Sequence, residues 1–158
     1  MLQFDGVARK LVYDFKYHHV RILAQFLAQF LADYFRTSRL PADILIPVPL
    51  HPRRLRERGY NQSGLLAQEL AHLILLPLDD TTLVRSINTP AQARTANIRA
   101  RQENVAGAFV CQNNSLKDKH VLLIDDVCTT GATLNACAVA LKNMDAASVW
   151  GLTVAREL

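Results

Sequence analysis

The sequence predicts an α/β fold in which a mainly parallel sheet is flanked by helices. Short apolar runs of the kind that form buried strands alternate with longer segments whose apolar residues recur at helical spacing. This alternation favours parallel strands joined by right-handed helical crossovers. The 158 residues, half of them apolar and one fifth charged, suit a single globular domain that spans 1–158.

The first half of the chain is predicted to form two amphipathic helices with a strand between them. The first helix covers residues 20–36, and its inward face is expected to hold Leu23, Phe26, Leu27, Phe30, Leu31, Tyr34 and Phe35. Residues 44–49 form a short apolar strand that ends in prolines, as a strand does where it leaves a core. The second helix covers 63–76, with Ser63 as its N-cap and an inward face formed by Leu66, Leu70, Leu73 and Ile74.

The second half of the chain is predicted to alternate strands, turns and helices, with Trp150 in the core. In chain order the elements are a strand at 81–85, a polar stretch at 86–101, a short helix near 98–105, a strand at 108–111, a polar turn at 113–119, a strand at 121–124, a helix from 131 to about 143 and a strand at 148–155. Ligands of such sheets bind beyond the carboxyl ends of the strands. The loops at 47–51 and 125–133 and the segment after Arg85 should therefore converge at one edge.

The most informative segment is residues 121–133, Val-Leu-Leu-Ile-Asp-Asp-Val-Cys-Thr-Thr-Gly-Ala-Thr. An apolar strand leads into two carboxylates and a hydroxyl-rich loop, which ends where a helix begins. The free N–H groups and the dipole of a helix N-terminus can hold a phosphate monoester without a lysine. Asp125 and Asp126 would repel that phosphate, but they would accept hydrogen bonds from neighbouring sugar hydroxyls. The alternative interpretation is an Asp-rich turn that only caps the next helix.

A ligand with a 5′-phosphate, vicinal ribose hydroxyls and a metal-bound pyrophosphate fits this order of groups, and phosphoribosyl pyrophosphate (PRPP) is such a ligand. The segment closely resembles the PRPP-binding signature of type I phosphoribosyltransferases. The resemblance implies that Asp125 and Asp126 are catalytic and bind the ribose hydroxyls, and that Mg²⁺ arrives on the pyrophosphate rather than in a protein cage. The implied PRPP-binding residues are Asp125, Asp126, Val127, Cys128, Thr129, Thr130, Gly131, Ala132 and Thr133.

Two further polar segments are candidates for the pyrophosphate end of such a ligand. Residues 51–63 follow a rigid Pro-Val-Pro turn and carry four arginines within six residues. Planar guanidinium groups bind phosphate oxygens bidentately. Residues 89–104 are expected to form a mobile polar cover that closes over a ligand. Each segment has a plain alternative as solvated surface. The candidate pyrophosphate and hood residues are Pro49, His51, Arg53, Arg54, Arg58, Asn61, Gln62, Gln92, Arg94 and Arg99.

The order of several motifs along the chain resembles the ComF competence-protein family. These motifs are Phe-Lys-Tyr-His at 15–18, Pro-Val-Pro-Leu-His at 47–51, Arg-Gly-Tyr-Asn-Gln-Ser at 58–63, Thr89 with Gln92, Arg99, Asn104 with Ala108-Phe109, and the PRPP signature. The resemblance covers nearly the whole chain. It implies a type I phosphoribosyltransferase fold with a small polar hood, transfer of phosphoribosyl groups from PRPP with release of pyrophosphate, and a role in DNA uptake during natural transformation.

Two departures and the cysteines refine this expectation. Many ComF proteins begin with a four-cysteine zinc module that this chain lacks, so we expect a short form or a fragment. Position 129 is threonine where related 6-oxopurine salvage enzymes carry an acid, which disfavours hypoxanthine and guanine as acceptors. Cys111 and Cys137 are expected in the core. Cys128, in the loop, is either a redox-sensitive thiol, whose pKa a helix N-terminus would lower, or a small filler.

The charge distribution leaves a second function open. The net charge of +4 is concentrated in arginine clusters, which suit either a phosphorylated small ligand or a nucleic-acid backbone. The alternative function is a non-catalytic module that keeps the PRPP pocket and binds single-stranded DNA or a competence helicase. Tyr60 is the aromatic residue near the first cluster, which gives little support for base stacking. With no signal-peptide core in 1–20 and no 18-residue apolar stretch, the sequence predicts a cytoplasmic protein without a membrane partner.

Overall fold

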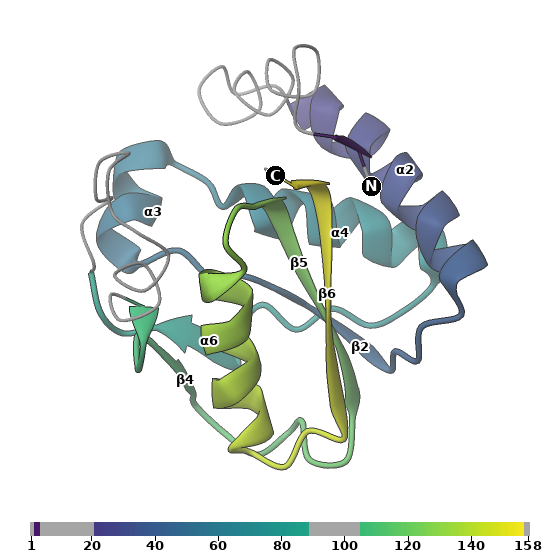
Figure 1. Ribbon diagram of the computed structural model, residues 1–158. Coiled ribbons are helices and arrows are strands. Elements are labelled where there is room, and N and C mark those ends of the chain that lie inside the picture. Colours follow the sequence, from purple (N-terminus) through teal and green to yellow (C-terminus); the bar gives the residue numbers. More distant parts are fainter. Residues whose placement is uncertain (1, 4–20, 89–104, 157–158) are drawn as a thin grey trace.

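The computed structural model describes residues 2–3, 21–88 and 105–156. Its main sheet has four parallel strands in the order β1-β6-β5-β2 (Figure 1). These strands are β1 Leu2–Gln3, β2 Ile44–Pro47, β5 His120–Cys128 and β6 Ser148–Arg156. A separate antiparallel pair is formed by β3 Leu83–Arg85 and β4 Phe109–Cys111. The predicted α/β fold with a mainly parallel sheet is confirmed.

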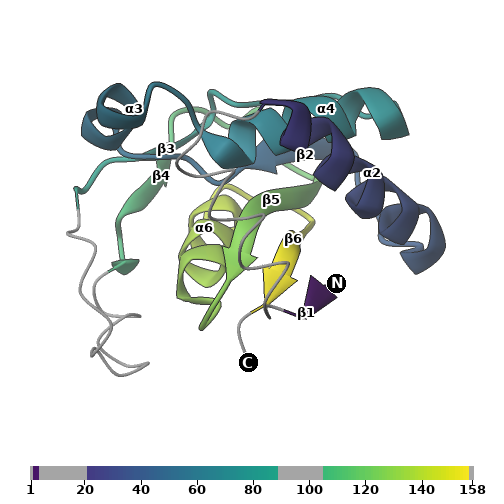
Figure 2. The same ribbon diagram turned by 90° about the horizontal axis from the view of Figure 1, so that it is seen from above.

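Helices cover both faces of the main sheet (Figure 2). On one face lie α2 Arg21–Ser38 and α4 Gln62–Ile74, and on the other lies α6 Ala132–Lys142 together with β3 and β4. A short helix, α3 Pro52–Arg58, follows β2. The core is therefore divided into two apolar clusters, one beneath α2 and α4 and one beneath α6.

The central strand is β5, which pairs with β2 on one side and with β6 on the other. Leu122 and Ile124 pack in the α2 and α4 cluster, whereas Val121 and Leu123 pack in the α6 cluster. A strand that is buried on both faces needs a continuous apolar run rather than alternation. This explains why residues 121–124 predicted a strand. The strand continues beyond that prediction to Cys128, so the two aspartates lie on a rigid strand end.

The packed face of α2 differs from the prediction. The buried side chains in this helix are Ala24, Leu27, Ala28, Leu31 and Ala32. The predicted inward residues Phe26, Phe30 and Tyr34 are 54%, 46% and 45% exposed, so the prediction is wrong for these three. The small alanines let α2 approach α4 closely, and this rotates the aromatic side chains to the flank of the helix. There the rings of Phe26 and Phe30 meet edge to face, with centroids 4.9 Å apart.

Two other local predictions are wrong. The N-cap of α4 is Asn61, and Ser63 lies inside the helix, because the chain enters the helical conformation earlier than the apolar pattern indicates. Trp150 is 43% exposed rather than in the core. It lies near the start of β6, whose outer edge is paired by β1 only at Ala155 and Arg156. The inward positions Leu66 and Leu70 of α4 are buried as predicted.

Several remaining elements follow the sequence. The strands predicted at 81–85 and 108–111 form the antiparallel pair, and the turn predicted at 113–119 connects that pair to β5. Cys137 is buried, whereas Cys111 is only half-buried. The polar cover at 89–104 and most of the short helix near 98–105 lie outside the described residues.

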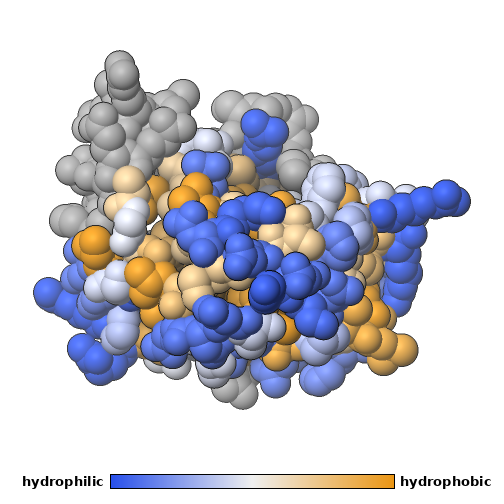
Figure 3. Space-filling model, turned by 90° about the horizontal axis from the view of Figure 1, so that it is seen from below, coloured by the Kyte–Doolittle hydropathy of each residue, from blue (hydrophilic) through white to orange (hydrophobic). Residues whose placement is uncertain are grey.

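The outer surface is mixed in character. Viewed from below, hydrophilic residues lie across the middle of the face and hydrophobic residues form separate patches (Figure 3). Within the described ranges, no helix combines the length and the apolar content that crossing a membrane would require.

Candidate functional site

The loop between β5 and α6 forms the wall of a pocket. The pocket opens to solvent and is lined by Asp125 and residues 127–134. Every predicted PRPP-binding residue except Asp126 therefore contributes to one cavity. The segments that form it are a strand end, a short loop and the first turn of a helix, which is the order that the sequence predicts.

Gly131 gives the loop its turn. It is the N-cap of α6 and has a left-handed backbone with φ 76° and ψ −1°. A residue with a Cβ pays about 1–2 kcal/mol in this conformation, although the nearest described atom, Sγ of Cys128, is 4.0 Å from the position that a Cβ would take. Strain rather than crowding therefore favours glycine here.

The N-terminus of α6 is arranged to receive an acceptor from outside the helix. Its N-cap is Gly131, which has no side chain that could cap the helix. The hydroxyl of Thr130 accepts a long hydrogen bond, 3.4 Å, from the N–H of Ala132. The first-turn N–H groups and the loop hydroxyls form a wall rich in donors, with the positive end of the helix dipole behind it.

The two aspartates differ in environment. Asp126 is 7% exposed and Asp125 is half-buried. One oxygen of Asp125, Oδ1, accepts a hydrogen bond from the hydroxyl of Ser63 at 2.8 Å and another from the N–H of Asp126 at 2.9 Å. The Asp125 carboxylate is therefore held in one orientation at the edge of the pocket. Sequence reasoning assigned Ser63 to a helix cap and missed this contact.

The arginine-rich segment after β2 is a helix rather than the predicted loop. The imidazole Nδ1 of His51 caps α3 by accepting a hydrogen bond from the N–H of Arg53 at 3.2 Å. Pro52 fills the first turn, where a missing N–H costs nothing. Gly59, with φ 80°, ends the helix and donates its N–H to the carbonyl of Leu55. Strong caps at both ends explain why so short and so charged a segment is helical.

The helical geometry separates the arginines into two groups. Arg53 and Arg56 are exposed, and Arg53 pairs with Glu57 at 3.0 Å on the outer surface. Arg54 and Arg58 are half-buried, and Arg58 reaches the side chain of Gln62 at 3.4 Å. The surface pair Arg53–Glu57 adds little stability because water screens it.

The start of α4 is tied to the loop after β2, which contains Pro49. Asn61 donates its side-chain N–H to the carbonyl of Val48 at 3.1 Å. Gln62 is buried directly behind it. Among the described residues, Oδ1 of Asn61 and Nε2 of Gln62 are buried without a hydrogen-bond partner. The hydrogen bond from Asn61 to Val48 thus connects the loop that contains Pro49 with the start of α4, where Asn61 and Gln62 lie.

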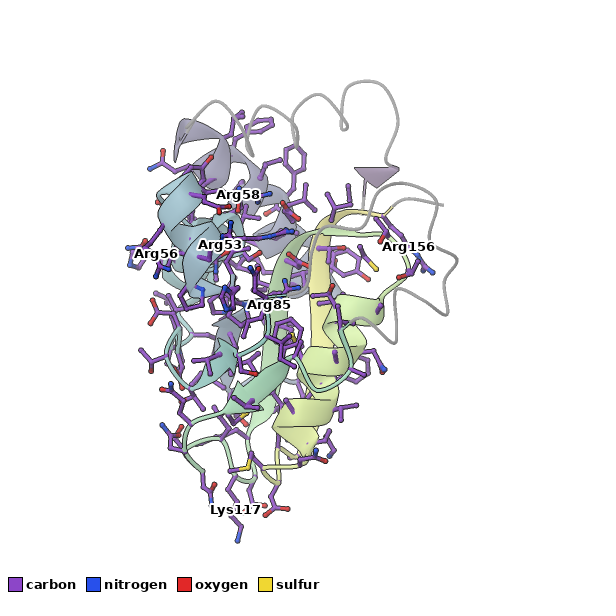
Figure 4. The ribbon with its side chains drawn as sticks, turned by 90° about the vertical axis from the view of Figure 1, so that its left-hand side faces the viewer. Arg53, Arg56, Arg58, Arg85, Lys117 and Arg156 are labelled. Atoms are coloured by element: carbon purple, nitrogen blue, oxygen red, sulfur yellow. The ribbon has the colours of Figure 1, made fainter. Side chains whose placement is uncertain are left out.

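Arg85 is a candidate site residue that the sequence analysis did not select. It ends β3, is half-buried, and its guanidinium carbon lies 5.4 Å from the centroid of the Phe109 ring. Burial lowers the pKa of Arg85, the charge of Arg54 lowers it further, and the charge of Asp125 opposes this. Arg85 therefore interacts electrostatically with Arg54 of α3 and with Asp125 at the pocket. In Figure 4 it lies near the middle of the molecule, below Arg53 and Arg58, with Lys117 at the bottom end.

The remaining predicted hood residues, Gln92, Arg94 and Arg99, lie outside the described residues, as does Asn104. Within the part of the chain that the structure describes, no group of three or more His, Cys, Asp or Glu side chains is placed to hold a metal ion. The described pocket thus combines the carboxylate of Asp125 with the loop and first helical turn at 127–134.

The thiols provide a test of pocket access. Cys128 lines the pocket, whereas Cys137 is buried and Cys111 is half-buried. Burial raises the pKa of both Cys137 and Cys111, which disfavours their reactive thiolate forms. We expect iodoacetamide to modify Cys128 first, as measured by peptide mass spectrometry over time. Earlier modification of Cys137 would contradict the packing described for α6.

Comparison with known proteins identifies the fold and the family. Residues 59–156 match the phosphoribosyl transferase domain family. This chain belongs to that family. The matched part of the phosphoribosyl transferase domain begins at the end of α3 and runs to the end of β6, so it contains α4, Arg85 and the whole pocket. The type I phosphoribosyltransferase fold expected from the signature is confirmed.

Two curated relatives agree with the motif order. Competence protein F of Haemophilus influenzae is 36% identical over 137 residues, which cover 84% of this chain and 59% of the relative. DNA utilization protein YhgH of Salmonella typhi is 35% identical over 137 residues, covering 86% of this chain and 60% of the relative. The matched part of this chain thus spans about three fifths of the length of these two relatives. The resemblance to the competence family is confirmed.

A solved structure supports the fold at low sequence identity. The glutamine PRPP amidotransferase of B. subtilis superposes with a TM-score of 0.60 and 16% identity, covering 90% of this chain and 30% of that protein. Similarity at this level concerns the arrangement of strands and helices. Function is therefore inferred from the residues of the site rather than from the fold.

Proposed function

We propose that this domain binds PRPP in the pocket between β5 and α6 and transfers its phosphoribosyl group to an acceptor, releasing pyrophosphate. The observation that carries the proposal is the juxtaposition in one cavity of an oriented carboxylate, Asp125, and the donor-rich N-terminus of α6. A sugar phosphate needs both features at a separation of a few atoms. Arg85, which interacts electrostatically with Asp125, would supply positive charge of the kind that a pyrophosphate needs.

The 5′-phosphate would lie against the loop at 129–131 and the first turn of α6. Backbone N–H groups there have no helical acceptor, and the hydroxyls of Thr129, Thr130 and Thr133 are donors on the same wall. The helix dipole adds a favourable potential for a dianion. Such a cradle binds phosphate through many directed hydrogen bonds rather than through one lysine.

The ribose hydroxyls would donate to Asp125 and Asp126. Hydrogen bonds to an ionised acceptor are worth about 1.5–3 kcal/mol each. Asp125 is already oriented by Ser63, so little ordering would be required when the ligand arrives. This arrangement would also distinguish ribose from deoxyribose, because a missing hydroxyl leaves a carboxylate without its donor.

The pyrophosphate would lie toward the half-buried Arg54, Arg58 and Arg85. Mg²⁺ would be carried by the ligand, as Mg²⁺ commonly is with phosphates. When bound, it would add positive charge beside the leaving group. The arginines would stabilise the charge that develops as the bond from C1 to the pyrophosphate oxygen breaks.

Calorimetry with PRPP and Mg²⁺ tests the binding part of the proposal. We expect saturable binding with one site, followed by pyrophosphate release when the correct acceptor from a panel of nucleobases is added. Heat of binding without release for any acceptor would favour a non-catalytic domain. Absence of PRPP binding would contradict the proposal as a whole.

Replacing Arg85 with methionine is expected to weaken PRPP binding about tenfold, because roughly one hydrogen bond to a charged group is lost. Methionine keeps an apolar stem against Phe109, so the fold should persist. Ribose 5-phosphate, which lacks the pyrophosphate, should bind the variant as it binds the wild type. Calorimetry with both ligands measures the difference. The matched control is Arg56→Met, an exposed arginine of α3, for which PRPP affinity should not change.

A second candidate function is the binding of single-stranded DNA or a helicase partner by the exposed face of α3. Arg53 and Arg56 are exposed, whereas Arg54 and Arg58 on the same helix are half-buried, and the relatives are named for competence and DNA utilization. Fluorescence anisotropy with single-stranded DNA should then show affinity that falls steeply with salt and drops in Arg56→Met. Both functions place the protein in the cytoplasm, where PRPP and incoming single strands are handled.

A further inference from the structure

Ser63 is placed to act on the candidate site through a second residue. It lies in the first turn of α4, is 4% exposed, and is 62 positions away from Asp125 in the sequence. Its hydroxyl donates to Oδ1 of Asp125 at 2.8 Å. Ser63 lies inside α4, past the N-cap Asn61, and its hydroxyl is directed at a carboxylate on the edge of the pocket.

We propose that Ser63 is a positioning residue that orients the Asp125 carboxylate toward the ribose hydroxyls of the ligand. The inference rests on the proposed PRPP-binding function and adds a residue from outside the signature segment to that site. Ser63 is absent from the lining of the pocket, so it would act only through Asp125.

The two hydrogen bonds at Oδ1 of Asp125 come from different directions. One comes from Ser63 in α4, and the other comes from the N–H of Asp126 in β5 itself. Rotation of the carboxylate about its bond to Cβ would break both hydrogen bonds at Oδ1. Hydrogen bonds to a charged group are among the stronger polar contacts in proteins. Ser63 thus holds one rotamer before the ligand arrives.

The start of α4 is itself held in place, which makes Ser63 a fixed reference. The side chain of Asn61 is bonded to the carbonyl of Val48, and Gln62 is bonded to Arg58 of α3. Residues 61–63 therefore connect α3 and the loop after β2 with the carboxylate of Asp125. A shift of α4 would move Asp125 relative to the phosphate loop.

The test measures the affinity of Ser63→Ala for ribose 5-phosphate and for inorganic phosphate by calorimetry. We expect about three- to tenfold weaker binding of ribose 5-phosphate, because the ligand would then have to order the Asp125 carboxylate when it binds. The affinity for inorganic phosphate should stay within twofold, because phosphate reaches the loop and not Asp125. The control Ser38→Ala removes a helix hydroxyl that donates to the carbonyl of Phe35 far from the pocket, and it should alter neither affinity.

A double-mutant cycle separates positioning from a general effect on structure. In an Asp125→Ala background, Ser63→Ala should cause no further loss, because its only route to the ligand has been removed. If the alanine variant is unfolded by circular dichroism, Ser63→Cys keeps the side-chain size with a weaker donor and serves instead.

Three results would overturn the inference while leaving the proposed function intact, provided that the wild type binds ribose 5-phosphate. These are an unchanged affinity of Ser63→Ala for ribose 5-phosphate, an equal loss for both ligands, and a full additional loss in the Asp125→Ala background. If the wild type fails to bind ribose 5-phosphate but binds inorganic phosphate, the proposed function fails and the inference fails with it.

Discussion

Replacement of both Asp125 and Asp126 by asparagine is expected to weaken PRPP binding about 100-fold or more, since two hydrogen bonds to charged acceptors are worth roughly 3–6 kcal/mol together. Asparagine keeps the size of each side chain but removes the charge, and one of its two terminal atoms becomes a donor that faces the ribose hydroxyls. Calorimetry with PRPP and Mg²⁺ measures the effect. The affinity for inorganic phosphate should stay the same or rise, because two negative charges beside the phosphate loop have been removed.

The same variant tests what the aspartates do for the fold. Asp126 is 7% exposed and Asp125 is held by Ser63, so neither is a freely solvated surface group. Asparagine can still accept at Oδ1, and we therefore expect a loss of about 1–2 kcal/mol in unfolding free energy rather than unfolding at 25 °C. An unfolded double variant in circular dichroism would show that the pair is a structural element. A folded variant with unchanged PRPP affinity would contradict the assignment of the ribose site.

Replacement of Ile124 by alanine is expected to cost about 2–5 kcal/mol in unfolding free energy. Ile124 is fully buried in β5 beneath α2 and α4, and it immediately precedes Asp125. The flanking helices cannot fill the void left by the missing side-chain atoms without moving the central strand β5. For a domain of this size the melting temperature should fall by about 2–4 °C for each kcal/mol.

Thermal and urea unfolding followed by circular dichroism measure this effect. The matched control is Val139→Ala in α6, where the side chain is 52% exposed and the change should stay within about 0.5 kcal/mol. Equal destabilisation by the two variants would contradict the central position of β5. At temperatures where Ile124→Ala remains folded, its PRPP affinity should be close to that of the wild type, because the side chain does not line the pocket.

The elements that the sequence predicted well are those specified by local pattern. The apolar run at 121–124 predicts a strand buried on both faces, and Gly131 followed by small residues predicts the start of α6. The signature segment contains its strand, loop and helix start within 13 residues, from Val121 to Thr133. Its pocket could therefore be predicted without knowledge of the rest of the fold.

The features that the sequence did not predict depend on contacts between distant segments. The packed face of α2 is set by close contact of its alanines with α4, and a pattern that counts apolar residues gives Phe26 and Phe30 more weight than Ala28. Arg85 reaches the site because β3 pairs with β4 across a long polar segment. Ser63 contacts a residue 62 positions away. No local spacing encodes these approaches.

The α3 segment shows a different limit of prediction from the sequence. Its arginines indicated a solvated loop, because high charge and a preceding proline turn are typical of loops. The structure instead caps both ends of a two-turn helix with His51 and Gly59. A histidine cap is a weak sequence signal compared with serine or aspartate. As a result, Arg53 and Arg56 are exposed, whereas Arg54 and Arg58 are half-buried.

A crystal structure of the protein grown with ribose 5-phosphate tests the central claim most directly. We predict phosphate density bonded to the N–H groups of residues 129–133, with ribose hydroxyls within hydrogen-bond distance of the carboxylates of Asp125 and Asp126. Density for the ligand elsewhere on the molecule, with the loop closed over an empty pocket at saturating ligand, would contradict the account.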